Sequence, residues 1–270
     1  MSLLLDPFAP DVARVPVAFV NVYLVGRSDR WIVVDTGLPG AAGLVRRAAE
    51  ARFGAGARPE AIVLTHGHFD HAGSALALAE HWDVPVYAHA LEQPYLTGRS
   101  DYAPQDPSMG GAIAFLSRFF PSSGFDLGRH VQVLPADGSV PGAPGWRWLH
   151  TPGHAPGHIS LWREADRVLV AGDAVITTRQ ESAYAVATQA PEIHGPPAYF
   201  TTEWDRARAS TRSLEGFEPE LILSGHGAPM AGPKMRAALH HLAGAFDALA
   251  VPHGGRYVAH PARPGYGAYR

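Results

Sequence analysis

The stretch Thr65-His66-Gly67-His68-Phe69-Asp70-His71-Ala72-Gly73 follows directly on the apolar run Ala61-Ile62-Val63-Leu64. It concentrates three of the 15 histidines of a 270-residue chain, together with a carboxylate, in one short segment. Imidazole nitrogen and carboxylate oxygen are the usual ligands of zinc and of neighbouring transition ions. The pattern H-x-H-x-D-H at the end of a strand therefore predicts a metal site.

The spacing within this motif predicts two metal positions. In an extended segment His66 and His68 project to the same side and can share one ion. If a helix begins near Asp70, its first turn directs Asp70 and His71 to a second position close by. The alternative is a helix N-terminus with Thr65 or Asp70 as the cap and three solvated histidines, although a capping residue can still serve a metal site.

The composition of the chain makes several classes of function improbable. A formal net charge of −3 offers no basic footprint for nucleic acid. The absence of cysteine excludes disulfides, thiolate ligands and a cysteine nucleophile. The first residues, Met1 to Pro7, lack a basic region and a long apolar core, and no apolar run of about 18 residues occurs. We therefore expect a cytoplasmic protein that uses no membrane and no nucleic acid.

Short apolar runs and helical spacings alternate along the chain, which favours layered α/β sheets. The expected strands are Val17 to Val25, Trp31 to Asp35, Ala61 to Leu64, Val84 to Ala88, Val131 to Leu134, Trp146 to His150, Ile159 to Trp162, Val168 to Ala171 and Leu221 to Ser224. The expected helices are Ala41 to Ala51, Gly73 to Trp82, Trp204 to Leu214 and Met235 to Leu249.

Polar residues recur directly after these strands, at Asp35, His66, His154, Asp173 and His226. Loops from one end of a sheet scaffold converge, so we expect these side chains to gather. Together the five positions resemble, in order and spacing, the motifs of the metallo-β-lactamase superfamily. The resemblance implies a single α/β domain over residues 1–270, a four-layer αβ/βα sandwich with mixed sheets and outer helices. Insertions are expected at about 98–128 and 176–204, and a short helical C-terminal extension at 232–270.

By this resemblance the chain is similar to the binuclear branch that includes glyoxalase II. Two divalent ions are implied, zinc being favoured and iron or manganese the alternatives. One ion would take His66, His68 and His154, the other Asp70, His71 and His226, with Asp173 bridging. A bridging aspartate is the pattern of thioesterases, lactonases and phosphodiesterases, whereas the B1 and B2 β-lactamases place a cysteine there. Glyoxalase II itself carries a helical domain for glutathione, which the short segment after His226 does not match.

The implied activity is that of a metallohydrolase. A hydroxide bridging two metal ions would attack a small-molecule ester-like bond, a thioester or a lactone first of all. Asp70 is the expected catalytic residue, since a carboxylate on the second metal can also accept a proton from the bridging water. The alternatives are a mononuclear iron enzyme similar to sulfur dioxygenases, a phosphodiesterase, and a metal-containing binding protein without catalysis.

Further residues are expected around this centre. Asp35 and His158 are candidates for orienting the ligands through hydrogen bonds, with a plain turn or structural role as the alternative. Arg179, Tyr184 and Tyr199 follow Asp173 and are candidates for substrate binding. The apolar segment Tyr102 to Phe125 predicts either a lid or an interface, so a homodimer is an open expectation.

Overall fold

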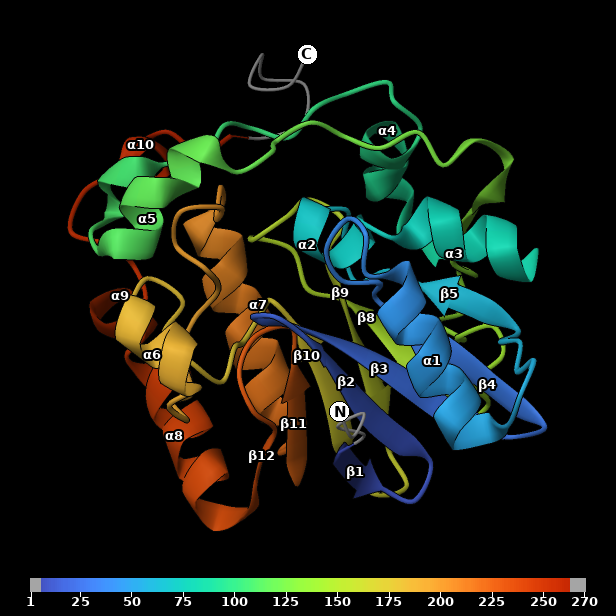
Figure 1. The fold of residues 1–270 in the computed structure, drawn as a ribbon. Coiled ribbons are helices and arrows are strands. Elements are labelled where there is room, and N and C mark those ends of the chain that lie inside the picture. Colours follow the sequence, from blue (N-terminus) through green and yellow to red (C-terminus); the bar gives the residue numbers. More distant parts are fainter. Residues whose placement is uncertain (1–5, 263–270) are drawn as a thin grey trace. The chain divides into compact units, whose positions relative to one another are not determined.

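The structure is a computed structural model that describes residues 6–262 (Figure 1). These residues form two compact units. The N-terminal unit comprises the chain up to Ser100 together with Ser123–Arg147, and the C-terminal unit comprises Asp101–Ser122 and the chain from Trp148 onward. The single domain expected over residues 1–270 stays a prediction.

Within the described residues, the N-terminal unit carries a seven-stranded mixed sheet in the order β1-β2-β3-β4-β5-β6-β7. The first four strands pair antiparallel, and β4 to β7 pair parallel. The strands are β1 (Asp6–Ala9), β2 (Val12–Val17), β3 (Val20–Arg27), β4 (Arg30–Val34), β5 (Ala61–Val63), β6 (Val86–Ala88) and β7 (Val131–Val133).

One expected strand, Val17 to Val25, is wrong at its start. The structure divides this region into β2 and β3, which form a hairpin with Val17 paired to Val20. The reversal falls at Ala18, whose φ of 55° lies in the left-handed region. A continuous apolar run hid the turn, because no glycine, asparagine or proline marks it at this point.

Helices pack on this sheet through small and branched side chains. The helices of the unit are α1 (Ala42–Phe53), α2 (Phe69–Ala72), α3 (Ala75–Trp82) and α4 (Gln93–Leu96), with single 3₁₀ turns at Ala90–Glu92 and Gly128–His130. Val45 of α1 and Leu78 of α3 are fully buried in one core cluster with Val33 of the sheet. Burying each such side chain stabilises the fold by about 1.5–3 kcal/mol.

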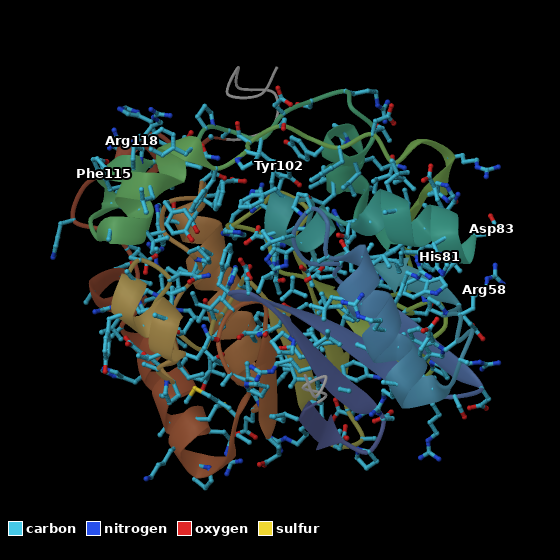
Figure 2. The ribbon with its side chains drawn as sticks, viewed as in Figure 1. Arg58, His81, Asp83, Tyr102, Phe115 and Arg118 are labelled. Carbon is cyan, nitrogen blue, oxygen red and sulfur yellow. The ribbon has the colours of Figure 1, made fainter. Side chains whose placement is uncertain are left out.

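The expected helix Gly73 to Trp82 begins two residues later, at Ala75. The break between α2 and α3 falls at Ser74, whose φ of −111° and ψ of 9° are not helical. Gly73 before it is required by close packing, since a Cβ placed there would lie 2.4 Å from the ring of Pro39 and 2.3 Å from the carbonyl oxygen of Phe69. At the other end of α3, Arg58 donates hydrogen bonds to the carbonyls of Trp82 and Asp83 (Figure 2).

The C-terminal unit, over its described residues, carries a five-stranded mixed sheet in the order β12-β11-β10-β9-β8. β10 pairs parallel with β11 and antiparallel with β9. The strands are β8 (Trp146–His150), β9 (Ile159–Arg163), β10 (Val168–Gly172), β11 (Leu221–Ser224) and β12 (Met230–Ala231). The α/β class with two mixed sheets is therefore confirmed.

Helices of the C-terminal unit share a core with this sheet. They are α5 (Ala112–Leu116), α6 (Ala183–Thr188), α7 (Trp204–Gly216), α8 (Gly232–Gly244), α9 (Phe246–Leu249) and α10 (Arg256–Ala259), with 3₁₀ turns at Pro107–Met109 and Ser117–Phe119. Leu214 of α7, Leu239 of α8 and Phe246 of α9 lie in one buried cluster with Leu169 and Ile222. The expected helix Met235 to Leu249 is interrupted at Ala245, whose φ of −119° and ψ of 29° are not helical.

The elements expected as insertions and extension are short helices. The first insertion contains α5 and the second contains α6, while the C-terminal extension contains α8, α9 and α10. Residues 263–270 of that extension lie outside the described residues. Among residues 6–262, no helix combines the length and the apolar character needed to cross a bilayer.

A buried carboxylate ties the first insertion to the C-terminal helices. Asp106 accepts hydrogen bonds from the backbone N–H of Ser108 at 3.0 Å and, through its second oxygen, from the backbone N–H of Arg256. Burial acts to raise the pKa of Asp106, but the hydrogen bonds from Ser108 and Arg256 and the charge of Arg256 outweigh it. The pKa of Asp106 therefore lies below its usual range.

Replacing Asp106 by Asn should remove a stability contribution that acid also removes. The unfolded carboxyl has a pKa of about 3.9, and a lower folded pKa means that the ionised form stabilises the fold above that value. The contribution is lost as the pH falls through the folded pKa. In urea unfolding, the difference in unfolding free energy between wild type and Asp106→Asn should be constant between about pH 6 and 8 and shrink below about pH 4. A difference that grows on acidification would contradict the direction of the shift.

Candidate metal centre

The histidine motif of the N-terminal unit forms a buried cluster. The chain leaves β5 at Val63, bends at Thr65, and enters α2 at Phe69 after His68, whose backbone is extended. The exposed fraction is 0% for His66 and His71, 4% for His68 and 6% for Asp70. The ring centre of His66 lies 4.6 Å from that of His68 and 4.2 Å from that of His71, and Asp70 Oδ2 lies 4.0 Å from His71 Nε2. The motif thus gathers its four side chains at one place.

Asp35, which directly follows β4, holds this cluster in place through hydrogen bonds. Its Oδ2 lies 2.8 Å from Nδ1 of His71, and its Oδ1 accepts a hydrogen bond of 2.8 Å from the backbone N–H of Thr65. The hydroxyl of Thr65 in turn lies 3.1 Å from Nδ1 of His66. When Nδ1–H of a histidine donates to a carboxylate, the tautomer and ring orientation are set, and Nε2 becomes the ligand atom.

Glu92 is a contributor that sequence reasoning missed. Its side chain is fully buried, and Oε2 accepts a hydrogen bond of 2.9 Å from the backbone N–H of Gly67. This bond fixes the peptide between His66 and His68. The sequence carried no signal for it, because Glu92 lies far along the chain in a short helical turn without a motif.

The C-terminal unit gathers a second buried cluster from three loops. His154 follows β8, Asp173 follows β10 and His226 follows β11. Asp173 Oδ2 lies 3.5 Å from Nε2 of His154 and 3.1 Å from Nε2 of His226. Each of the three residues is at most 2% exposed. One carboxylate oxygen of Asp173 therefore lies close to both imidazoles. This arrangement suits an aspartate that is shared between two metal positions.

Protein groups also occupy Nδ1 of these two histidines. The hydroxyl of Thr201 lies 3.3 Å from Nδ1 of His154, and the amide of Gln180 lies 2.6 Å from Nδ1 of His226. The amide oxygen and nitrogen of glutamine exchange by a half-turn of the side chain, so Gln180 can accept a proton from Nδ1 and leave Nε2 as ligand. Gln180 and Thr201 carried no motif in the sequence and were missed.

Gly153 and His158 lie close to His154 in the sequence, and both make close contacts with other segments of the unit. Gly153 has a φ of 134°, and a Cβ there would lie 2.3 Å from the backbone nitrogen of Ala207 in α7, so only glycine fits. His158 accepts a hydrogen bond of 2.8 Å from the backbone N–H of Asp173 through Nε2, and its Nδ1 lies 2.9 Å from the hydroxyl of Thr151. Both ring nitrogens of His158 are thus engaged within the protein, which positions the Asp173 loop.

The three candidates for substrate binding differ in their surroundings. Arg179 lines a pocket of the C-terminal unit, with Nη2 3.9 Å from Oε1 of Glu192. Tyr184 on α6 is 75% exposed, whereas Tyr199 is buried against Phe200. Substrate binding by these residues stays a prediction.

The apolar segment expected as a lid or an interface presents two phenylalanines to solvent. Phe115 is 56% and Phe119 is 76% exposed, and the guanidinium of Arg118 lies 3.6 Å from the ring centre of Phe115 (Figure 2). Ala114 and Ser117, on the other side of this short helical stretch, are buried. The lid and the interface both stay predictions.

The donor set of each unit fits a divalent metal ion. Imidazoles with a protein partner on Nδ1 and buried carboxylates are the ligands that zinc and similar ions prefer. Burying carboxylates among imidazoles is costly unless a cation or hydrogen bonds compensate the charge. The chemistry of the residues present thus agrees with a bound metal.

Comparison with known proteins identifies the family. The sequence profile of the Metallo-beta-lactamase superfamily matches residues 15–226. The chain is 48% identical over 245 residues to the "Probable metallo-hydrolase YflN" of Bacillus subtilis, which covers 89% of this chain and 93% of that relative. This chain belongs to the metallo-β-lactamase superfamily, and it is related to curated metallo-hydrolases.

Two further similarities are more distant. The "Hydroxyacylglutathione hydrolase GloC" of Haemophilus influenzae is 31% identical over 113 residues, 42% of this chain and 48% of that protein. The crystal structure of BLEG-1 B3 metallo-beta-lactamase matches with a TM-score of 0.58 and 25% identity, over 82% of this chain and 93% of that one.

Replacing Asp35 by Asn should weaken metal binding without unfolding the chain. The carboxylate that orients His71 is lost, and removal of such a partner typically lowers metal affinity by about 10–100-fold. Competition with a chromogenic zinc chelator measures the affinity. Asp166→Asn is the matched control, because Asp166 pairs with Arg163 away from the histidines. Equal zinc affinity of Asp35→Asn and wild type, both with native circular dichroism, would refute the role given to Asp35.

Proposed function

We propose that the chain is a metal-dependent hydrolase that holds two divalent ions. One ion would be held by His66, His68 and His154, the other by Asp70, His71 and His226, with Asp173 shared. The observation that carries this proposal is the Nδ1 partner of the imidazoles in both clusters, above all the 2.8 Å contact of Asp35 with His71. Histidines that only pack or are only solvated do not need their second ring nitrogen presented in this way.

The substrate class we propose is a small molecule with an ester-like bond, a thioester before a lactone. The similarity to a protein named as a hydroxyacylglutathione hydrolase supports acyl transfer from sulfur to water. A net charge of −3 disfavours polyanionic nucleic acid as the substrate. The family includes β-lactamases among the structures similar to this chain, so a β-lactam belongs among the substrates to be tested.

Some of these residues would position the metal ligands, and another would transfer a proton. When bound, divalent ions would supply a nucleophile from water at neutral pH and a Lewis acid for the carbonyl oxygen. Asp35 and Glu92 hold the motif loop rigid, so the donors of the N-terminal cluster need no rearrangement. Asp70, whose carboxylate is nearly buried beside His71, is the residue we propose to accept the proton of the attacking water.

The competing functions differ in metal content and in the bond that is cleaved. An enzyme similar to sulfur dioxygenases would hold one iron, and a phosphodiesterase would cleave a phosphoryl bond. A binding protein would hold metal without turnover. Zinc is our proposed metal, with iron and manganese as the alternatives that the same ligands accept.

Elemental mass spectrometry on protein purified without added metal, combined with a substrate panel, tests the proposal. The panel contains a thioester, a lactone, a phosphodiester and a β-lactam. We expect about two zinc or manganese ions per chain and turnover of the thioester or the lactone. One iron per chain without hydrolysis would indicate an enzyme similar to sulfur dioxygenases and would contradict the hydrolase proposal. Metal without any turnover would favour a binding protein.

Replacing Asp173 by Ala tests the shared carboxylate. The expected result is a fall in kcat of at least about 100-fold and a loss of metal, with little change in the far-ultraviolet circular dichroism. Asp166→Ala serves as the control for loss of a carboxylate from the same unit. An Asp173→Ala variant that is active and keeps both metals would exclude the binuclear arrangement.

A further inference from the structure

The C-terminal unit contains a pocket of about 550 Å³ that the proposed mechanism does not use. Four stretches of chain line it: residues 109–112, the loop that contains Arg179, the region of His194, and residues 248–253. Most of the lining side chains are small and apolar, such as Ala112, Ala198 and Ala250. The pocket therefore combines small apolar residues with several polar groups, as small-molecule sites do.

Close packing holds the walls of this pocket together. A Cβ on Gly111 would lie 2.4 Å from the carbonyl oxygen of Glu181, and one on Gly195 would lie 2.5 Å from Cβ of Ala250. The carboxylate of Asp106 joins the stretch before the first wall to the backbone of Arg256, which follows the last wall. The pocket is thus a built feature of the unit.

The polar groups of the pocket favour an anion. His194 is only 7% exposed, and its Nδ1 lies 3.1 Å from the carbonyl oxygen of Gly195. Nδ1–H therefore donates to Gly195, and Nε2 can donate to an anion when the ring carries both protons. The guanidinium of Arg179 forms a long ion pair with Glu192 at 3.9 Å, without a hydrogen bond, and both side chains are about half exposed. A ligand carboxylate would therefore compete with Glu192 for this guanidinium. The carboxylate of Glu181 accepts a hydrogen bond of 2.7 Å from the backbone N–H of Ala198, so this acid is already engaged.

The chemistry of these groups selects a carboxylate on a short carbon chain. A guanidinium binds a carboxylate through two parallel hydrogen bonds, and a neighbouring imidazole can add a third. Small apolar residues beside it accommodate methylene groups, which a bare phosphate does not offer. His253, which also lines the pocket, is a further nitrogen donor at its rim.

The same loop reaches both the pocket and the histidine cluster of this unit. The chain turns in this loop, where the backbone N–H of Ser182 donates to the carbonyl of Arg179 at 3.2 Å. Arg179 and Glu181 line the pocket, whereas Gln180 between them is 1% exposed and lies 2.6 Å from His226. The backbone N–H of Thr177 also donates to the carbonyl of His226 at 3.0 Å. A ligand in the pocket would therefore lie one residue away from a group that orients a proposed metal ligand.

We propose that this pocket binds the free carboxylate of a small organic acid, through Arg179 and His194, as the non-reacting end of the substrate. The substrate class is then an ester or thioester that carries a second, uncleaved carboxylate. The assignment as a substrate subsite rests on the proposed hydrolase function, while carboxylate binding in the pocket does not.

Isothermal titration of the protein as purified tests the binding step with probes that cannot be hydrolysed as esters. Succinamate carries one carboxylate, succinamide is its neutral counterpart, and methylphosphonate represents a phosphoryl group. Succinamate should bind at least about 10-fold more tightly than succinamide, and Arg179→Gln and His194→Gln should each weaken it by about 10-fold or more. The matched controls are Arg236→Gln and His240→Gln, both in surface ion pairs with glutamates.

Three results would overturn the proposal. Succinamate binding that is unchanged in both pocket variants and is lost on chelation of the metal would place the carboxylate at the metal centre. Tighter Arg179-dependent binding of methylphosphonate would assign the pocket to phosphoryl groups. No binding of succinamate to the wild-type protein would remove the site altogether.

Kinetics separate this proposal from the hydrolase proposal. For a thioester that carries a distal carboxylate, Arg179→Gln should raise KM by about 10-fold with kcat unchanged, and it should leave the uncharged analogue unaffected. If no ester is hydrolysed but succinamate binds through Arg179, the pocket proposal stands and the hydrolase proposal fails. If esters are hydrolysed and Arg179→Gln changes neither KM nor succinamate binding, the hydrolase proposal stands and the pocket proposal fails.

Discussion

The contact between Asp35 and His71 is the constraint on which the N-terminal cluster depends. An imidazole has two nitrogens, and a buried one can serve as a ligand only when the other has a partner in the protein. Asp35 provides that partner from the end of β4, and it also fixes the start of the motif loop through Thr65. The parallel pairing of β4 with β5 brings these two strand ends together, so the sheet register itself sets the position of His71.

The C-terminal unit meets the same requirement with neutral partners. Thr201 and Gln180 stand beside His154 and His226, where the N-terminal unit uses a carboxylate beside His71. A carboxylate partner makes an imidazole more basic than a hydroxyl or an amide does. His71 would therefore be a stronger ligand than His66, His154 or His226, whose Nδ1 partners are neutral.

Our proposals place substrate specificity and catalysis on different segments of the chain. The ligand loops follow strands, where backbone pairing limits their movement. The pocket is lined by the loop after Asp173, by a short insertion around Gly111 and by residues after α9. Variation in the segments that line a pocket changes what is bound, which is how one fold serves many reactions.

The sequence by itself determined the family, the α/β class and the candidate ligands, because the crowded motif after Leu64 and the polar residues after later strands are local patterns. It did not reveal the hairpin turn at Ala18, where no glycine, asparagine or proline marks the reversal, nor the break at Ala245, although Gly244 directly precedes it. Only the tertiary structure decided the roles of Glu92, Gln180 and Thr201 and the position of Tyr199. Each of these depends on contacts between segments that are distant in the chain, and such contacts leave no spacing in the sequence.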